Sequence, residues 1–198
     1  MSQKIAFFDF DGTITKDDSF LKFIRFVVGD FRFFIGFLIL LPILILYKLK
    51  VIPNHKAKEI VLRYFFKGCK EEEFKKVANE YSLNHIKTIL RQKAMEKINW
   101  HKENGHKVVI VSASIDCWLR SWCEKNSLEL LATKIEIKDG KVTGKLKSLN
   151  CFGAEKVNRI KESYDLEKFD YIYAYGDSRG DKEMLALANE SFYKPFLD

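Results

Sequence analysis

Short apolar runs alternate with helical patterns along much of the chain. The runs at 4–10, 107–114 and 171–178 are apolar, and glycine or small polar residues end each of them, as is typical of buried strands. Helical patterns follow the second run and flank the third. An Asp-Gly pair between alternating residues predicts a hairpin at 135–146. Strands that alternate with helices predict an α/β layer with a mainly parallel sheet.

The segment from about 16 to 104 breaks this rhythm. It contains no convincing strand, and its pattern is helical. Because it lies between the first two predicted sheet strands, we expect an inserted all-helical cap over the active edge of the sheet. The catalytic core would then comprise residues 1–15 and 105–198, and the cap residues 16–104.

Acidic residues stand at or just after the ends of the first and third apolar runs, where ligands bind in such sheets. Asp9 and Asp11 are two apart, so their side chains are expected to point the same way and converge. Asp177 lies at the end of the third run and Asp181 follows it. Each aspartate alone could cap a turn or a helix, but that leaves the pair at a strand end unexplained. Four carboxylates at one edge need a cation, and oxygen ligands without histidine or cysteine suit Mg²⁺.

Four signatures in this order resemble the haloacid dehalogenase (HAD) superfamily. They are "DFDGT" at 9–13, Ser112 in "VIVSAS", Lys156 in "CFGAEK" and "GDSRGD" at 176–181. The helical insertion after the first motif is similar to the phosphoserine-phosphatase-like branch (subfamily IB). The resemblance implies a Rossmann-like three-layer core with a helical cap.

The resemblance also implies a chemical role for each residue of the first motif. Asp9 would be the nucleophile that forms an aspartyl-phosphate, and Asp11 the general acid and base. Gly12 would let the backbone approach the phosphate, while Thr13 would tie down the turn. True dehalogenases lack the second aspartate, so its presence favours phosphoryl transfer.

The remaining signatures would bind the metal and the phosphoryl group. The resemblance implies that Mg²⁺ is held by the Asp9 carboxylate, the Asp11 backbone carbonyl and Asp177. Asp181 would orient the water shell of the metal or the side chain of Lys156. Ser112 and Lys156 would bind the phosphoryl oxygens. No role is assigned to Ser114, the other serine at the end of this strand.

The net charge and the cysteine pattern limit the kinds of partner and compartment that we expect. The net charge of +7 fits an anionic membrane surface or a phosphorylated substrate. No dense run of Lys and Arg alternates with aromatic residues, so we expect no nucleic-acid partner. The four cysteines form no CxxC pair and the start of the chain does not resemble a signal peptide, which favours a cytoplasmic protein with reduced thiols.

The fifteen residues 33–47 carry no charge and have basic residues on both sides. As one helix they would be ~22 Å long, short of the ~30 Å hydrocarbon core of a bilayer. Pro42, with Gly36 before it, favours a kink or a hairpin. A helix buried between cap and core is the alternative. We expect a segment that lies in or dips into the membrane, and so a peripheral or monotopic protein at the inner membrane face.

Residues of the predicted cap indicate which class of substrate the protein acts on. In soluble phosphoserine phosphatases a Glu and an Arg of the cap read the amine and the carboxylate, and Asp18 and Arg63 stand near those positions here. "DSF" after the first motif, "LLPI" in the cap and "CFGAEKV" are similar to the phosphatidylglycerophosphate phosphatase C group. The resemblance thus implies a Mg²⁺-dependent phosphomonoester hydrolase for a lipid phosphate. A soluble small-metabolite phosphatase and a catalytically inactive membrane-binding module are the alternatives.

Overall fold

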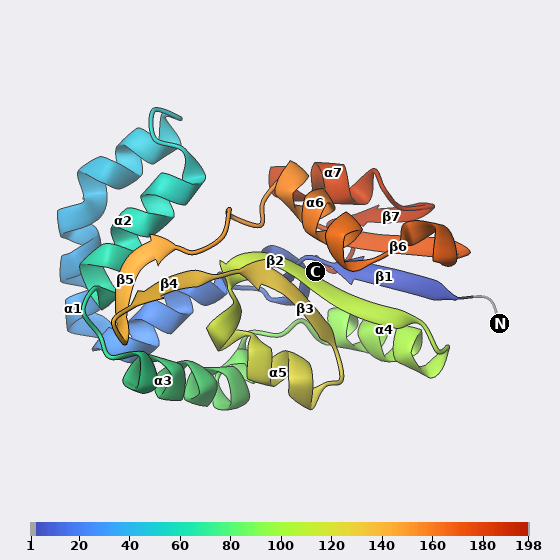
Figure 1. The fold of residues 1–198 in the computed structure, drawn as a ribbon, viewed down its shortest axis with the longest axis horizontal. Helices are drawn as coiled ribbons and strands as arrows, with labels where there is room; N and C mark the ends of the chain where they lie inside the picture. Colours follow the sequence, from blue (N-terminus) through green and yellow to red (C-terminus); the bar gives the residue numbers. More distant parts are fainter. Residues whose placement is uncertain (1–2, 198) are drawn as a thin grey trace.

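A parallel five-stranded sheet forms the centre of the protein, in the order β3-β2-β1-β6-β7 (Figure 1). We describe residues 3–197 of a computed structural model. The sheet strands are β1 (Lys4–Phe8), β2 (Lys107–Ile115), β3 (Glu129–Thr133), β6 (Tyr171–Gly176) and β7 (Glu190–Tyr193). The α/β prediction is confirmed. The sequence pattern did not reveal β3 and β7, which are short edge strands that each begin with a glutamate.

Helices cover both faces of the sheet and extend beyond one end. They are α1 (Ser19–Lys48), α2 (Asn54–Phe66), α3 (Glu71–Asn84), α4 (Gln92–Glu103), α5 (Arg120–Lys125), α6 (Ala154–Ser163) and α7 (Lys182–Leu185). Single-turn helices lie at Phe10–Ile14, Ile86–Thr88, Asp116–Trp118, Leu166–Lys168 and Arg179–Asp181.

The side chains of β1 alternate between two hydrophobic cores. Ile5 and Phe7 belong to the core on the side of α6 and α7. Ala6 and Phe8 belong to the larger core, which includes residues of α4 and α5 and continues into the insertion. The strand is therefore buried on both faces, and the three-layer arrangement follows from this alternation.

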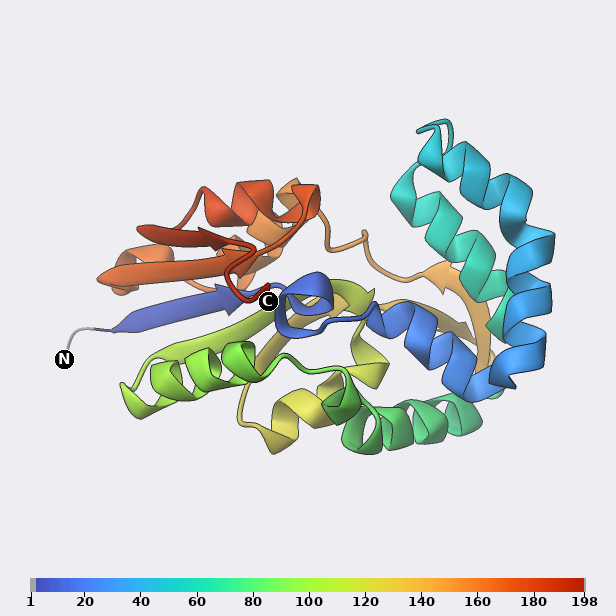
Figure 2. The same cartoon turned by 180° about the vertical axis from the view of Figure 1, so that it is seen from behind.

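The insertion begins with two antiparallel helices that form an arm (Figure 2). The bend in α1 lies at Gly29, whose φ of 76° and ψ of 168° are not helical. Pro42 stays inside the helix, and the chain reverses only after Lys48, so the expected hairpin at Pro42 is wrong. Gly36 is buried against α2, where an added Cβ would lie 2.4 Å from Cζ of Phe65. Glycine at this position therefore allows α1 and α2 to pack closely.

The predicted hairpin at 135–146 is confirmed as β4 (Ile135–Lys138) and β5 (Lys141–Leu146). Its turn residues Asp139 and Gly140 both have positive φ, as the Asp-Gly signal requires. The hairpin packs against α2, whereas α4 packs against β2 of the sheet. The division at residues 15 and 104 stays a prediction, because elements on either side of it contact both parts.

Candidate active site

A tight turn after β1 brings the first motif against the end of β6. The backbone N–H of Asp9 donates to the carbonyl of Tyr175 at 2.9 Å, which continues the strand pairing. The chain then turns through Phe10–Ile14, and Gly12 adopts a φ of 87°. A Cβ at this glycine would lie 2.4 Å from Oδ2 of Asp177. Both the left-handed backbone and the close approach therefore require glycine.

Lys156 is the centre of a buried charged cluster. Its Nζ donates to Oδ1 of Asp9 at 2.5 Å, to Oδ1 of Asp181 at 2.7 Å and to the carbonyl of Val111 at 2.6 Å. Burial alone would lower the pKa of this lysine, but the two carboxylates outweigh it and raise the pKa. With all three N–H groups engaged, the ammonium holds Asp9 in one orientation.

Asp181 has a partner for each carboxylate oxygen. Oδ1 accepts from Lys156, and Oδ2 accepts from the backbone N–H of Ser178 at 2.9 Å, from its Oγ at 2.8 Å and from the N–H of Asp177 at 3.2 Å. Although burial opposes the effect, Lys156 and these donors keep the pKa of Asp181 low. The geometry favours the second of the two expected roles, because Asp181 contacts Lys156 directly.

Three carboxylates are close enough to hold one cation. Single oxygens of Asp9, Asp177 and Asp181 lie within 4.8 Å of one another. Thr13 lies between the first two, since its hydroxyl is 3.3 Å from Oδ2 of Asp9 and 3.1 Å from Oδ1 of Asp177 and can donate its one proton to either. Oδ2 of Asp181 already accepts three hydrogen bonds, whereas Oδ2 of Asp9 and Oδ1 of Asp177 share only the hydroxyl of Thr13. Asp9 and Asp177 are therefore the two carboxylates best placed to bind a metal.

The chemistry of this cluster fits Mg²⁺. Burial, and then the charge of Asp181, raise the pKa of Asp177, as expected for carboxylates crowded without a metal. All candidate ligands are hard oxygens, which Mg²⁺ prefers. The carboxylate of Asp11 is not part of the cluster, so only its backbone carbonyl remains as a candidate ligand from that residue.

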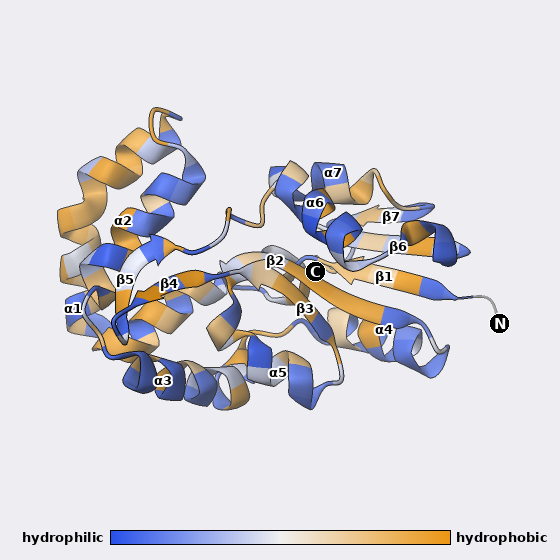
Figure 3. Ribbon diagram, in the orientation of Figure 1, coloured by the Kyte–Doolittle hydropathy of each residue, from blue (hydrophilic) through white to orange (hydrophobic). Residues whose placement is uncertain are grey.

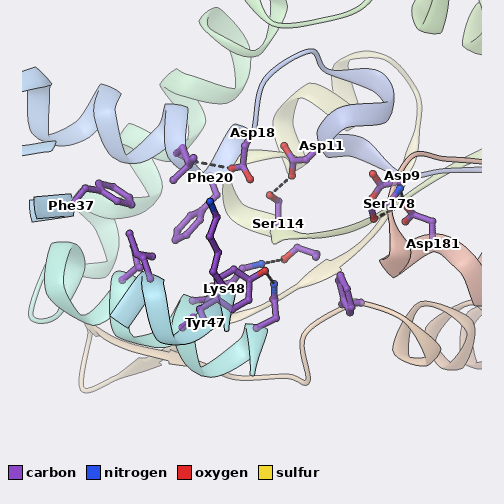
Figure 4. A pocket seen from close by; sticks show the side chains of 18 of the residues that line it. Asp9, Asp11, Asp18, Phe20, Phe37, Tyr47, Lys48, Ser114, Ser178 and Asp181 are labelled. Atoms are coloured by element: carbon purple, nitrogen blue, oxygen red, sulfur yellow. Dashed lines mark hydrogen bonds between the residues drawn. The ribbon is translucent and has the colours of Figure 1, made fainter. Parts of the chain in front are cut away.

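The Asp11 side chain points to a different part of the cavity (Figure 4). Its Oδ1 accepts from the backbone N–H of Ser19 at 2.6 Å, and its Oδ2 accepts from Oγ of Ser114 at 2.5 Å. The expected convergence of the two carboxylates is wrong, because β1 ends at Phe8 and strand alternation no longer applies. Burial, with a smaller contribution from Asp18, raises the pKa of Asp11 to about 6. A carboxyl group with such a pKa can exchange protons near neutral pH.

The two serines at the end of β2 have different surroundings. Ser112 is buried, and its Oγ accepts from the backbone N–H of Ser114 at 3.0 Å. Ser114 lines the cavity and contacts Asp11, whereas Ser112 does not line it. No role was predicted for Ser114 from the sequence. Its position at the same strand end, two residues after Ser112, was nevertheless an indication that it belongs to the site.

One cavity of about 690 Å³ joins the carboxylates to the insertion. Its polar wall includes Asp9, Asp11, Ser114 and Lys156, and its apolar wall belongs mainly to α1 and α2. The apolar side chains that line it include Phe20, Leu21, Phe37, Leu41, Leu44, Ile45 and Val61. The same cavity therefore offers phosphate chemistry at one end and an apolar surface at the other.

The two expected substrate-reading residues of the cap are placed differently. Asp18 lines the cavity, and its side chain also accepts from the N–H of Leu21 at 3.0 Å to cap α1. Arg63 is exposed and does not line the cavity, so the structure does not bring it to the substrate. Lys58, five residues earlier, does line it. Five helical residues correspond to a rotation of about 140° between side chains, which puts the two cations on different faces.

Residues 6–186 match the haloacid dehalogenase-like hydrolase family. The chain belongs to this family. It is 35% identical to Protein CicA of Caulobacter vibrioides over 191 residues, which is 96% of this chain and 85% of that protein. A "probable phosphatase" of Mycobacterium tuberculosis is 29% identical over 132 residues, which is 65% of this chain and 46% of that one.

Solved structures share the fold. A protein of unknown function from Bordetella pertussis Tohama I has a TM-score of 0.81 at 21% identity, with coverage of 98% of this chain and 90% of the other. A phospho-aspartyl intermediate analogue of phosphoserine phosphatase has a TM-score of 0.70 at 20% identity, with 98% and 87% covered. The HAD hydrolase thus has the fold of the phosphoserine-phosphatase-like branch, and its relatives support a phosphatase. The similarity to the phosphatidylglycerophosphate phosphatase C group stays a prediction.

Proposed function

We propose that this HAD hydrolase is a Mg²⁺-dependent phosphomonoesterase that removes phosphate from a lipid at the inner face of a membrane. One observation carries the proposal: the cavity that contains Asp9, Asp11 and Lys156 continues along an apolar wall of α1 and α2. A phosphate at the carboxylates would leave the rest of the substrate beside apolar side chains, which favour an apolar chain.

The chain's own residues can carry out the reaction in two steps. In the first, the carboxylate of Asp9 attacks phosphorus, the bond to the leaving oxygen breaks, and protonated Asp11 gives that oxygen its proton. In the second, Asp11 takes a proton from a water molecule as its oxygen attacks phosphorus, the bond from phosphorus to the Asp9 oxygen breaks, and inorganic phosphate leaves. Lys156 fixes the orientation of Asp9 throughout. Mg²⁺, held by Asp9, Asp177 and the Asp11 carbonyl, would neutralise charge on the phosphoryl group.

The outer face of α1 supports the membrane location (Figure 3). Phe31, Leu38 and Ile39 are 78%, 69% and 57% exposed. By its length and composition alone, α1 could cross a membrane, and little of its apolar stretch is buried. A contiguous apolar surface of this kind marks a contact site.

An anionic bilayer is the occupant that fits this face. Arg32, Lys48 and Lys50 are exposed at the ends of the apolar stretch, where they would meet lipid phosphates. The neighbouring α2 carries charged residues, so the arm would lie in the interface and not span the bilayer.

A soluble small-metabolite phosphatase is the second candidate. Asp18 and Lys58 line the cavity and offer one negative and one positive group, which could pair with an amine and a carboxylate. The fold shared with phosphoserine phosphatases is compatible with this candidate but shows the fold alone.

A substrate panel separates these candidates. We expect hydrolysis of p-nitrophenyl phosphate with Mg²⁺, its loss in excess chelator, and poor restoration by Ca²⁺, whose looser coordination would misplace Asp9. A long-chain lipid phosphate in anionic vesicles should have a higher kcat/KM than O-phosphoserine. The reverse preference would select the soluble phosphatase, and full activity in excess chelator would overturn the metal requirement. A folded protein that hydrolyses none of them would be the inactive membrane-binding module.

A further inference from the structure

Lys58 is a cation of the cavity that the proposed chemistry does not use. It lies on α2, and its Nζ donates to the carbonyl of Ala113 at 2.7 Å and to Oδ1 of Asn150 at 3.3 Å. Ala113 stands between the two serines at the end of β2. The ammonium of Lys58 thus crosses from the cap to the end of the sheet that carries the phosphate chemistry.

The partners of Lys58 are neutral, in contrast to those of Lys156. Lys156 forms ion pairs with Asp9 and Asp181 at 2.5 and 2.7 Å. Within residues 3–197, Lys58 has no carboxylate oxygen within 4.0 Å, and two acceptors leave the third N–H of its ammonium available. Burial lowers the pKa of Lys58, although the more distant charges of Asp11 and Asp18 oppose this shift. A cation in this position would be stabilised by an anion that enters the cavity.

A network behind Lys58 holds its acceptor in place. Oδ1 of Asn150 also accepts from Oγ1 of Thr133 at 3.1 Å, and its Nδ2 donates to Oδ1 of Asn54 at 2.7 Å. The ring of Phe20 lies 5.8 Å from the ammonium. The cation is therefore oriented before any ligand arrives, as a recognition group should be.

We propose that Lys58 is the specificity-determining residue with which the cap binds a second anionic group of the substrate, next to the phosphomonoester. The inference rests on the proposed phosphatase activity. The second anion can be a phosphodiester of a lipid headgroup or a carboxylate of a small metabolite, since both present oxygens to an ammonium. In either case, the substrate would carry two anionic groups.

Two matched substrate pairs test this role. The lipid pair is dodecyl phosphate and dodecyl phosphoglycerol phosphate, which adds an anionic diester between the chain and the terminal phosphate. The soluble pair is phosphoethanolamine and O-phosphoserine, which adds a carboxylate. Each pair is measured with the full chain, Mg²⁺ and three proteins: wild type, Lys58→Met, and Lys56→Met as the control. Lys56 is exposed on the same helix and does not line the cavity, so its substitution removes an equal charge from the protein.

We expect wild type to prefer the two-anion member of one pair, and that pair identifies the anion. Lys58→Met should lower kcat/KM for that member about 10- to 100-fold, the range of a charge-assisted hydrogen bond, and the one-anion member less than about threefold. The loss should appear mainly in KM, Lys58→Arg should restore part of it, and Lys56→Met should behave as wild type.

Other outcomes overturn the proposal. Equal losses on both members of both pairs would mean that Lys58 holds the cap to Ala113 or acts through Asp11. No loss, or no wild-type preference for two anions, would remove Lys58 from recognition and leave the phosphatase intact. Wild type that hydrolyses none of the four compounds would instead overturn the proposed function. If Lys58→Met melts early, Lys58→Gln, which keeps a hydrogen-bond donor, replaces it under the same criteria.

Discussion

The catalytic edge of the sheet and the arm of α1 and α2 differ in which side chains they bury and which they expose. At the edge, the charged groups of Asp9, Lys156 and Asp181 are buried and paired with one another. On the arm, Phe31 and Leu38 are large, apolar and mostly exposed. A buried charge needs partners within the fold, whereas an exposed apolar face can be covered by the surface of another molecule. The edge is thus built to hold a small ion and a phosphate, and the arm to meet something outside the chain.

The strongest test of the edge is Asp9→Asn. The amide cannot form an aspartyl-phosphate, so we expect turnover of p-nitrophenyl phosphate to fall by at least about 10³-fold. Circular dichroism should show an unchanged fold. Asp11→Asn is the matched control: it should retain more aspartyl-phosphate formation on this substrate, because p-nitrophenolate leaves without a proton. Near-normal turnover by pure Asp9→Asn protein would rule out this nucleophile.

Alanine substitutions of two glycines with positive φ, one at the edge and one in the arm, compare the two regions directly. Gly12→Ala places a Cβ 2.4 Å from Oδ2 of Asp177, whereas nothing lies within 4 Å of a Cβ at Gly29. Both alanines strain the backbone by roughly 1–3 kcal/mol. Only Gly12→Ala should also displace Asp177. It should therefore raise the Mg²⁺ concentration needed for activity and lower kcat/KM by about 10- to 100-fold. Melting curves and Mg²⁺ titrations measure both effects, and equal kinetic losses in the two variants would contradict the assignment of Asp177.

Two leucines of α1 test the arm. Leu38 is 69% exposed and Leu40 is 6% exposed. Leu38→Lys should weaken binding to anionic vesicles by about tenfold, with little change in melting temperature. Leu40→Lys buries an unpaired charge and should lower the free energy of unfolding by roughly 3–5 kcal/mol. Vesicle co-sedimentation and thermal melting separate the two effects.

Leu149→Lys provides the control for this pair. Leu149 is 73% exposed, but it lies outside the arm, on the segment before α6. Its substitution should leave both vesicle binding and melting unchanged. If Leu38→Lys binds vesicles as wild type does, the arm does not face lipid and the soluble phosphatase becomes the better candidate.

The last comparison concerns the stability of the edge, through a buried histidine behind it. His101 is fully buried, with Nε2 2.9 Å from the hydroxyl of Tyr175 and Nδ1 2.8 Å from Nδ1 of His106. Burial, with smaller contributions from His106 and Lys97, lowers the pKa of His101 to about 3. Between pH 6.5 and 3 the unfolded chain therefore binds more protons, so this group's contribution to stability falls as pH falls, by at most about 1.4 kcal/mol per pH unit.

Denaturant unfolding of wild type and His101→Gln over this pH range isolates the histidine. The buried carboxylates, whose raised pKa values give the opposite slope, are present in both proteins and cancel in the difference. The wild-type free energy of unfolding should decline more steeply toward low pH than that of the variant. Parallel curves would show that folding does not lower the pKa of His101.

Much of the catalytic edge could be predicted from short stretches of sequence. The turn at 9–13 and the loop at 176–181 are local structures. Gly12 has the positive φ that the turn requires, and Oδ2 of Asp181 accepts from Asp177 and Ser178, a few residues earlier in the chain. The hairpin at 135–146 is local in the same sense, because Asp139 and Gly140 alone provide its turn. Such features follow from backbone conformations that the residues themselves prefer.

The sequence by itself also determined that residues 33–47 form an apolar surface, since no charge interrupts them. Only the tertiary structure decided which face of it is buried. Gly36 packs on α2 and Leu40 lies inside, while the backbone departs from helical geometry at Gly29 and the chain reverses only after Lys48. It also decided that Lys58, and not Arg63, reaches the cavity, because the rotation of α2 about its axis is fixed by contacts with α1 and β5. Composition sets how apolar or charged a helix is, but the neighbours against which it packs set the direction of each side chain.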